Sequence, residues 1–305
     1  MGVITGFLER LARRPVLFDG AMGSMLLAEV LPPGAAPELW NTERPEVISR
    51  IHRAYLAAGA EVVTTNTFGG TLLRLSAYGL GARCVELNFA AVQRAMAARL
   101  EFRDRQVFVA GDIGPCGKFF PPVGDLAAAA LTDSVKAQVE VFAAAGVDLL
   151  LIETMVDLRE AEIALRTARR LTDVPVAVTM TFDRKPRGYF TIMGHTPSEA
   201  VRRLTDAGAD VVGANCTLAA EDMVELAEIL VAASPVPVLV QPNAGQPEIV
   251  DGRAVYHVSP GQFAAAMKRI LDLGVAAVGG CCGTTPEHIR AVAELISPGE
   301  HDGAG

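Results

Sequence analysis

Two adjacent cysteines, Cys281 and Cys282, lie in the segment VGGCCGTTPEHI near the end of a chain of 305 residues. The chain has five cysteines in all, and an odd number with irregular spacing does not form a disulfide framework. In a reducing compartment, clustered cysteines more often bind a metal or take part in chemistry. A strained vicinal disulfide and a pair of packed core thiols are the structural alternatives. The place of the other cysteines in the fold decides between a metal or chemical site and these two alternatives.

A repeated pattern indicates which elements position these cysteines. Each copy ends a helix with a glycine, continues through four or five apolar residues and stops at a polar residue. Glycine is preferred directly after a helix, and a short apolar run between turn signals is typical of a strand buried on both faces. The spacing leaves room for two βα units between successive copies. The copies are AAGAEVVTTNT from Ala57, AAGVDLLLIET from Ala144, DAGADVVGANC from Asp206 and DLGVAAVGGCC from Asp272.

Four further apolar runs, at 15–19, 106–112, 174–180 and 236–241, supply the strands that the repeat requires. Amphipathic helical stretches separate the runs. Eight strands that alternate with helices predict an α/β fold, the (β/α)8 TIM barrel. An open doubly wound sheet is the alternative, but no G-x-G-x-x-G follows the first strand. We predict a single barrel domain over 1–298 and a flexible C-terminal tail over 299–305.

The predicted strand ends are polar, and in this fold the chemistry lies at the ends of the strands. Cys216 ends the sixth predicted strand, whereas Cys281 and Cys282 end the eighth, so three of the five cysteines converge on one edge of the barrel. The other polar groups at these ends are Asp19, Thr65-Asn66-Thr67, Asp112, Glu153-Thr154, Asn215, Gln241 and Asn243.

Three converging thiolates are suited to Zn²⁺, which prefers sulfur and a tetrahedral shell. A structural zinc site has four protein ligands, whereas three ligands leave one position open, as in catalytic sites. An open position on a sulfur-rich zinc favours another thiol and deprotonates it. We expect the neighbouring glycines Gly279, Gly280 and Gly283 to let both adjacent sulfurs face one metal. The remaining cysteines, Cys84 and Cys116, are expected to pack in the interior, although Cys116 lies on the functional edge.

Composition excludes several classes of function. The net charge is −8 and no run of basic residues interrupts it, which argues against a nucleic-acid groove. The basic clusters LARRP and TARR are expected to be ordinary helix faces. No stretch reaches the ~18 uninterrupted apolar residues of a membrane span, and the N-terminus carries charges where a signal peptide is apolar. We therefore expect a cytoplasmic protein without nucleic-acid or membrane partners.

Seven motifs together resemble the homocysteine S-methyltransferase family, most closely its cobalamin-dependent branch. The resemblance extends from about residue 14 to residue 296, and the pairing of GANC with GGCCGT is its most specific part. The motifs are FDGAMGSML, TNTFGG, GDIGPCGK, IETMVD, GANC, QPNAG and GGCCGTTPEHI.

The resemblance implies one Zn²⁺ per chain on Cys216, Cys281 and Cys282, with the homocysteine sulfur as the fourth ligand. The thiolate would attack an activated methyl group and form methionine. The resemblance also implies a set of substrate contacts. Glu153 and Asp19 would hold the ammonium group, backbone amides of the Gly20–Ser24 loop, including Gly20, Ala21 and Ser24, would meet the carboxylate, and Asn215 and Thr67 would line the pocket.

The methyl donor remains open at this point. The cobalamin-dependent branch normally carries folate and cobalamin domains on the same polypeptide, and this chain has no residues left to build them. Either a corrinoid protein on a separate chain delivers methylcobalamin, or a small sulfonium compound is the donor, or the chain is a fragment of a larger enzyme. The alternative functions are methyl transfer to another thiol, and a non-catalytic subunit that binds homocysteine or a corrinoid protein.

Overall fold

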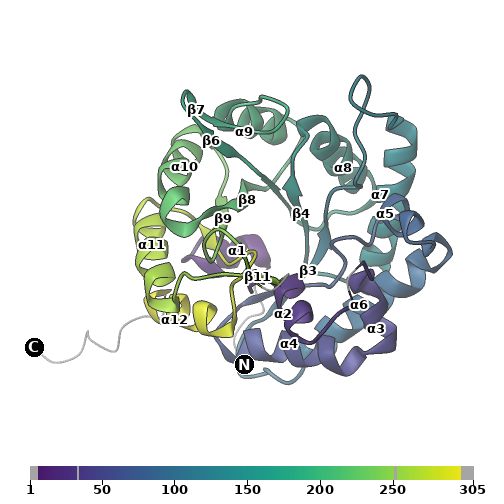
Figure 1. Cartoon of the computed structure of the whole chain (residues 1–305), viewed down its shortest axis with the longest axis horizontal. Helices are drawn as coiled ribbons and strands as arrows, with labels where there is room; N and C mark the ends of the chain where they lie inside the picture. The colour runs from purple at the N-terminus through teal and green to yellow at the C-terminus, as the bar shows by residue number, and fades with distance from the viewer. Residues whose placement is uncertain (1–5, 33, 251–252, 297–305) are drawn as a thin grey trace, which may run out of the picture.

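A closed barrel of eight parallel strands forms the centre of the molecule (Figure 1), seen in a computed structural model that describes residues 6–32, 34–250 and 253–296. The strand order is β1-β12-β9-β8-β5-β4-β3-β2, and a bridge between Phe18 and Val62 joins the first strand to the last. This closure confirms the predicted TIM barrel and excludes the open sheet. The strands are β1 (Val16–Leu17), β2 (Val62–Thr64), β3 (Phe108–Ile113), β4 (Leu149–Met155), β5 (Val176–Met180), β8 (Val211–Ala219), β9 (Val238–Asn243) and β12 (Ala277–Val278).

In the part of the chain that the structure describes, eight longer helices surround the barrel. The four glycines of the sequence repeat follow helices and have left-handed backbones, with φ of 107°, 77°, 99° and 89° at Gly59, Gly146, Gly208 and Gly274, as predicted. Each glycine ends a helix and turns the chain into the next strand. The helices are α4 (Pro45–Ala57), α6 (Cys84–Arg99), α7 (Ala128–Ala145), α8 (Leu158–Leu171), α9 (Pro197–Asp206), α10 (Ala220–Ala233), α11 (Pro260–Asp272) and α12 (Pro286–Ile296).

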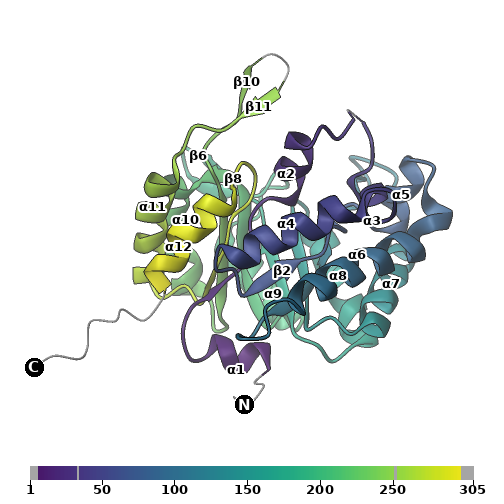
Figure 2. The same ribbon diagram turned by 90° about the horizontal axis from the view of Figure 1, so that it is seen from below.

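Shorter elements lie at the two ends of the barrel (Figure 2). α1 lies at the end from which the strands start, whereas the hairpin of β10 and β11 projects at the opposite end. No sequence pattern predicted this hairpin or the one formed by β6 and β7. The shorter elements are α1 (Phe7–Leu11), α2 (Met22–Ala28), η1 (Pro37–Leu39), α3 (Trp40–Glu43), α5 (Leu72–Ala77), η2 (Gly81–Arg83), β6 (Asp183–Lys185), β7 (Gly188–Phe190), β10 (Glu248–Val250) and β11 (Arg253–Val255).

The interior of the barrel is an apolar core that α1 closes from below. Phe7 and Leu11 of α1 belong to one cluster with inward-facing strand residues. The ring of Phe7 meets the rings of Phe18 and Phe108 edge-on, at centroid distances of 6.1 Å and 5.6 Å. A second, larger cluster fills the space between the strands and the outer helices. Among the described residues, the barrel is therefore filled at its amino end, which leaves its carboxyl end for a site.

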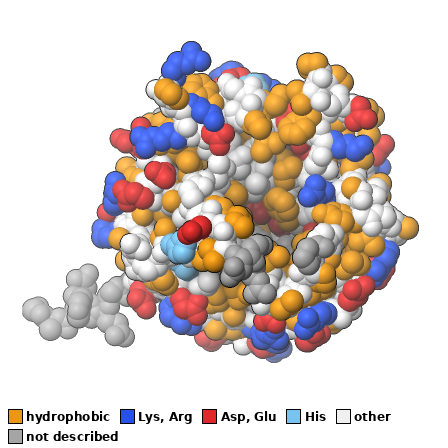
Figure 3. All heavy atoms as spheres, viewed as in Figure 1, with side chains coloured by type: hydrophobic (Ala, Val, Ile, Leu, Met, Phe, Trp, Pro, Cys, Tyr) orange, Lys and Arg blue, Asp and Glu red, His pale blue; other side chains and the backbone are white. Residues whose placement is uncertain are grey.

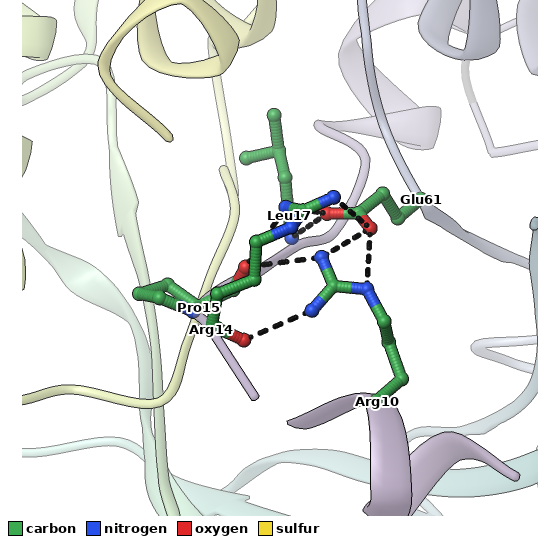
Figure 4. Close-up of polar contacts among 5 residues, drawn as sticks. All are labelled: Arg10, Arg14, Pro15, Leu17 and Glu61. Atoms are coloured by element: carbon green, nitrogen blue, oxygen red, sulfur yellow. Dashed lines mark hydrogen bonds and ion pairs between the residues drawn. The ribbon is translucent and has the colours of Figure 1, made fainter. Parts of the chain in front are cut away.

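A buried ion pair attaches α1 to the barrel (Figure 4). The Arg10 Nε donates a hydrogen bond of 3.0 Å to the Glu61 Oε2, and the Arg14 Nη1 donates one of 3.0 Å to the Glu61 Oε1. Arg10 is only 8% exposed. The expectation that LARRP is an ordinary helix face does not hold for Arg10, which is buried against Glu61 from a distant part of the chain.

Two further predictions concern the C-terminal tail and membrane-spanning helices. The predicted tail over 299–305 lies outside the described residues, so the boundaries of the barrel domain stay a prediction. Among the residues described, no helix is sufficiently long and apolar to cross a membrane.

Candidate metal and substrate site

Three cysteine sulfurs meet at the carboxyl end of the barrel. The Sγ atoms of Cys216 and Cys282 are 3.8 Å apart, and those of Cys216, Cys281 and Cys282 all lie within 4.8 Å of one another. Zinc–sulfur bonds of about 2.3 Å in a tetrahedral shell separate two sulfurs by roughly 3.8 Å. The spacing and the all-sulfur donor set therefore fit Zn²⁺, and the predicted convergence of these cysteines is present.

An irregular end of β8 presents Cys216. The register between β8 and β9 shifts between Asn215 and Ala219, and both Cys216 and Thr217 have left-handed backbones, with φ of 61° and 62°. A left-handed backbone costs roughly 1–2 kcal/mol in a residue with a side chain, and a bulge turns side chains away from the regular alternation. The Cys216 Sγ is therefore placed by a strained backbone at the end of β8.

Close packing of glycines presents Cys281 and Cys282. Gly283 has a left-handed φ of 79°, and an added Cβ would lie 2.1 Å from the Tyr256 ring. Gly280 has no left-handed backbone, but its added Cβ would lie 2.4 Å from the Thr284 Oγ1. The expectation that the glycines free the backbone therefore applies to Gly283, whereas Gly280 is needed for close approach. The Cys281 amide donates to the Pro242 carbonyl at 2.8 Å, which holds this segment against the end of β9.

The three thiols influence one another's ionisation. Hydrogen bonds from Cys281 and Cys282 lower the pKa of Cys216 to about 3, and an Asn243 hydrogen bond acts in the same direction. The shared hydrogen bond to Cys216 raises the pKa of Cys282 to about 11. Without a cation, one thiolate is favoured and further ionisation is opposed. A divalent cation inverts this preference, since it stabilises all three thiolates.

Four carboxyl groups line the same cavity as the cysteines: Asp19, Glu38 and Asp112 are buried, and Glu153 is half-buried. Burial raises the pKa of Asp19 to about 8, against the opposing hydrogen bonds from Thr64. Burial also raises the pKa of Glu153 to about 7, and the charge of Cys216 adds to the effect. Asp112 bonds to Glu153, and burial raises its pKa well above its ordinary value. The cluster is short of positive charge, so an ammonium group complements it.

Asn215 positions Glu153 rather than lining the cavity. Its Nδ2 donates to the Glu153 Oε2 at 2.7 Å, and its Oδ1 accepts from the Thr154 amide at 2.8 Å. Thr154 has a left-handed φ of 57°, where the register between β4 and β5 shifts. Asn215 is fully buried and is not among the residues that line the cavity. Asn215 therefore supports a side chain that lines the cavity, and its role in binding substrate stays a prediction.

Of the other residues predicted to bind substrate, three line the cavity and Thr67 does not. Gly20, Ala21 and Ser24 line the cavity, although the Ala21 amide already donates to the Thr284 Oγ1 at 3.1 Å. Thr67 is fully buried outside the lining, and its hydroxyl donates to the Asp112 carbonyl at 2.7 Å. The structure thus brings the first-loop residues to the cavity and leaves Thr67 behind it.

The other two cysteines pack as predicted. Cys84 is buried and its Sγ donates to the Gly70 carbonyl at 3.4 Å. Cys116 is buried in the apolar core, and burial together with nearby Glu160 raises its pKa to about 12. Neither cysteine lines the cavity.

The cavity has a volume of about 550 Å³ and opens on the face that Figure 3 shows hollowed near its centre. Besides the strand ends, Glu38, Phe68, Arg74 and Tyr78 line it. No sequence pattern pointed to these four residues, and none gave a role to Asp112. The signal for Asp112 was its place at a strand end, whereas Glu38 and Arg74 come from short helices that no strand pattern indicates.

Comparisons with known proteins show the family to which this chain belongs. A model of the homocysteine S-methyltransferase family matches residues 16–296. The chain is 33% identical over 307 aligned residues to methionine synthase of Mycobacterium tuberculosis and to that of Mycobacterium leprae. Each alignment covers 96% of this chain but 25% of the relative, so the chain spans about a quarter of the length of these curated relatives.

A similar solved structure supports the fold. The metallated form of the homocysteine methyltransferase MmuM from Escherichia coli superposes with a TM-score of 0.78 at 24% identity, over 95% of this chain and 99% of that one. The apo form of the same protein gives a TM-score of 0.74 at 25% identity, over 96% and 99% of the two chains. The barrel described above therefore has the same architecture as that enzyme.

Proposed function

The chain belongs to the homocysteine S-methyltransferase family, a family of methyltransferases, and we propose that it methylates the thiol of homocysteine to form methionine. The observation that carries this proposal is one cavity that holds both a three-sulfur cluster and buried carboxyl groups. The cluster suits the thiol end of an amino thiol, and the carboxyl groups suit its ammonium end. Methyl transfer to a thiol without an ammonium group would leave the carboxyl groups without a partner.

We propose that Cys216, Cys281 and Cys282 hold one Zn²⁺. The metal, when bound, acts as a Lewis acid that lowers the pKa of a coordinated substrate thiol. The protein's own contribution is geometric. Strand ends and glycine packing fix the three sulfurs before substrate arrives, so little reorganisation is needed at the moment of reaction.

Glu153 and Asp19 are proposed to hold the substrate ammonium through charge-assisted hydrogen bonds. An ammonium group favours the ionised carboxylates and so opposes the effect of burial on their pKa values. Asn215 keeps the Glu153 carboxylate in place through the hydrogen bond to Oε2. Asp112, which bonds to Glu153, is the group best suited to retain a proton in this cluster.

The substrate carboxylate is proposed to lie against the Gly20–Ser24 loop. This segment lines the cavity and its last three residues form the first turn of α2, where backbone amides have no intrahelical acceptor. With both head groups held, the substrate sulfur is oriented toward the cysteines. Orientation of this kind lowers the barrier because the reactants no longer have to find each other. The methyl donor is proposed to be either methylcobalamin on a corrinoid protein or a small sulfonium compound.

A donor panel tests the function. Zinc-loaded protein is incubated with homocysteine and, in turn, with methylcobalamin, S-adenosylmethionine, S-methylmethionine and betaine, with and without a corrinoid protein, and methionine is quantified. Absence of methionine in every arm would contradict the proposed function.

Substitution of the proposed ligands and head-group contacts tests the site. Cys216→Ala is expected to remove stoichiometric zinc, whereas Cys84→Ala, a matched control at a buried cysteine, retains it. Glu153→Gln is expected to keep zinc and raise the homocysteine KM about 10- to 100-fold, because a charged hydrogen bond contributes ~1.5–3 kcal/mol. Zinc content is measured by elemental analysis. Full zinc in Cys216→Ala, or an unchanged KM in Glu153→Gln, would refute the corresponding role.

A further inference from the structure

Two neighbouring segments contribute to the proposed homocysteine site. The Gly20–Ser24 segment, here called the first loop, follows β1 and lines the cavity. The turn over 280–283, here called the cysteine turn, follows β12 and carries Cys281 and Cys282. β1 and β12 pair side by side, although they come from opposite ends of the chain. The contacts between the first loop and the cysteine turn decide whether the two can move independently.

Thr284 joins the two segments. Its side chain is fully buried and is not among the residues that line the cavity. Its hydroxyl donates to the Cys281 carbonyl at 2.7 Å and accepts from the Ala21 amide at 3.1 Å. The Cys281 carbonyl belongs to the peptide bond between the two adjacent cysteines. One hydroxyl, used both as donor and as acceptor, therefore connects the cysteine turn to the first loop.

The Thr284 hydroxyl is closely packed between the backbones that it joins. An added Cβ on Gly280 would lie 2.4 Å from the Thr284 Oγ1, and one on Gly20 would lie 2.7 Å from the same atom. The two glycines thus let the hydroxyl approach both segments. Hydrogen bonds in a buried chain also strengthen one another. A change in the orientation of the peptide between the cysteines therefore reaches the first loop.

Two further contacts restrain this junction. The Gly283 amide donates to the Ser24 Oγ at 2.9 Å, which joins the same two segments a second time. The Tyr55 hydroxyl of α4 lies 3.0 Å from the Ala21 carbonyl and 3.1 Å from the Thr284 carbonyl. Tyr55 is fully buried and, like Thr284, does not line the cavity. The junction is therefore held from the helix side as well.

A connection of this kind links the binding of two ligands. A metal on Cys281 and Cys282 restrains the cysteine turn, and Thr284 passes the restraint to the first loop, which is proposed to meet the substrate carboxylate. An amino-acid head group then meets a loop that is already ordered, so less freedom is lost on binding. Coupling between binding sites is reciprocal, so the head group strengthens metal binding by the same factor.

We propose that Thr284 is a positioning residue that couples metal binding at the cysteines to binding of the amino-acid head group at the first loop. This inference rests on the proposed function, since it concerns the metal and the substrate of that reaction. It assigns a role to a residue that is placed to touch neither. Loss of the metal therefore weakens binding of the head group even when no bond between metal and substrate sulfur is involved.

The test uses L-2-aminobutyrate, which has the head group of homocysteine and no sulfur to bind the metal. Isothermal titration calorimetry gives its Kd for reduced, metal-free protein and for zinc-loaded protein, and the ratio of these two Kd values measures the coupling. In wild type, zinc is expected to lower the Kd about 5- to 10-fold. In Thr284→Val, which removes the hydroxyl and keeps the shape, the ratio is expected to fall to about one. Thr284→Ser, which retains a hydroxyl, is expected to keep the wild-type ratio.

Thr167→Val is the matched control. Thr167 is buried on α8 outside the cavity lining, and its hydroxyl donates to the Ile163 carbonyl at 2.7 Å. Its loss is expected to leave the coupling ratio unchanged. Tyr55→Phe is a second variant of the junction that leaves Thr284 and the cysteine turn intact, and it is expected to lower the ratio at least about twofold. Circular dichroism and elemental analysis show that each variant is folded and loaded with zinc.

A ratio of about one in wild type would overturn the coupling and leave the proposed function intact, as would a wild-type ratio in Thr284→Val. A ratio that falls equally in Thr284→Ser would also overturn it, because the hydroxyl would then not be the cause. If Thr284→Val does not fold or does not bind zinc, Tyr55→Phe decides: a lowered ratio supports the coupling and an unchanged ratio overturns it. Failure of wild type to bind zinc or L-2-aminobutyrate would contradict the proposed function, and this inference with it.

Discussion

At the scale of single residues, the three-cysteine cluster lies next to a closely packed glycine, Gly283. Gly283 and Gly146 have nearly the same left-handed backbone, with φ of 79° and 77°. Their surroundings differ completely. An added Cβ meets the Tyr256 ring at 2.1 Å on Gly283 and meets nothing within 4 Å on Gly146. A glycine-to-alanine substitution at each of these two positions therefore separates the effect of the left-handed backbone from the effect of close packing.

Gly283→Ala is expected to displace the segment that carries Cys281 and Cys282 and to lower the zinc stoichiometry of the purified protein. Gly146→Ala is expected to lower the free energy of unfolding by about 1 kcal/mol, the cost of a left-handed alanine, with zinc unchanged. Elemental analysis and denaturant titration give the two quantities. Equal zinc content in the two variants would show that contact with Tyr256 does not hold the site together.

At the scale of elements, α4 connects the interior to the site. Its Tyr55 hydroxyl lies 3.0 Å from the Ala21 carbonyl and 3.1 Å from the Thr284 carbonyl, and can donate to either. One helical turn earlier, His52 is fully buried, and neither ring nitrogen has a hydrogen-bond partner among the described residues. Burial lowers the pKa of His52 from its ordinary 6.5 to about 4. The helix that supports the first loop thus contains a group that resists protonation.

This depressed pKa makes stability depend on pH. Between pH 6.5 and 4 the unfolded chain binds the proton and the folded chain does not, so the free energy of unfolding decreases as pH falls through this window. The loss amounts to about 3 kcal/mol and levels off below pH 4, where both states are protonated.

His52→Leu is expected to remove that part of the pH dependence, because leucine fills a similar volume and does not titrate. Denaturant titrations of wild type and variant from pH 7.5 to 4 give the free energy of unfolding of each protein. In the difference between the two proteins, the contributions of the other titratable groups cancel. Parallel stability curves for the two proteins would contradict the assignment.

At the scale of the whole molecule, stability and function lie at opposite ends of the barrel. α1 and the ion pair of Arg10 with Glu61 close the amino end, whereas the cysteines and the cavity lie at the carboxyl end. This division is general in the fold, where loops after the strands carry the chemistry. Changes at the amino end should therefore alter stability without altering the site.

Glu61→Gln is expected to destabilise the fold by about 3 kcal/mol, because it leaves the buried Arg10 without a counter-charge. The homocysteine KM and zinc content should not change. Glu101→Gln is the control, since Glu101 pairs with Arg53 on the surface and its loss should cost less than about 1 kcal/mol. Equal effects of the two substitutions on the free energy of unfolding would argue against a buried role for Glu61.

The sequence alone determined the barrel and the place of its chemistry. Apolar runs followed by polar residues marked the strand ends, and glycines after helices marked the repeat, because both signals are local in the chain. The convergence of Cys216 with Cys281 and Cys282 followed from the fold, since parallel strands of a barrel end at one edge. Asp19 and Glu153 line the cavity for the same reason.

The tertiary structure decided where the polar side chains point. Asn215 and Thr67 occupy strand-end positions like the others, but they bond to Glu153 and to the Asp112 carbonyl instead of lining the cavity. Shifts of strand register and left-handed backbones at strand ends set these directions, and no local pattern reports them. Glu38 and Arg74 likewise line the cavity only because distant segments meet in the folded chain.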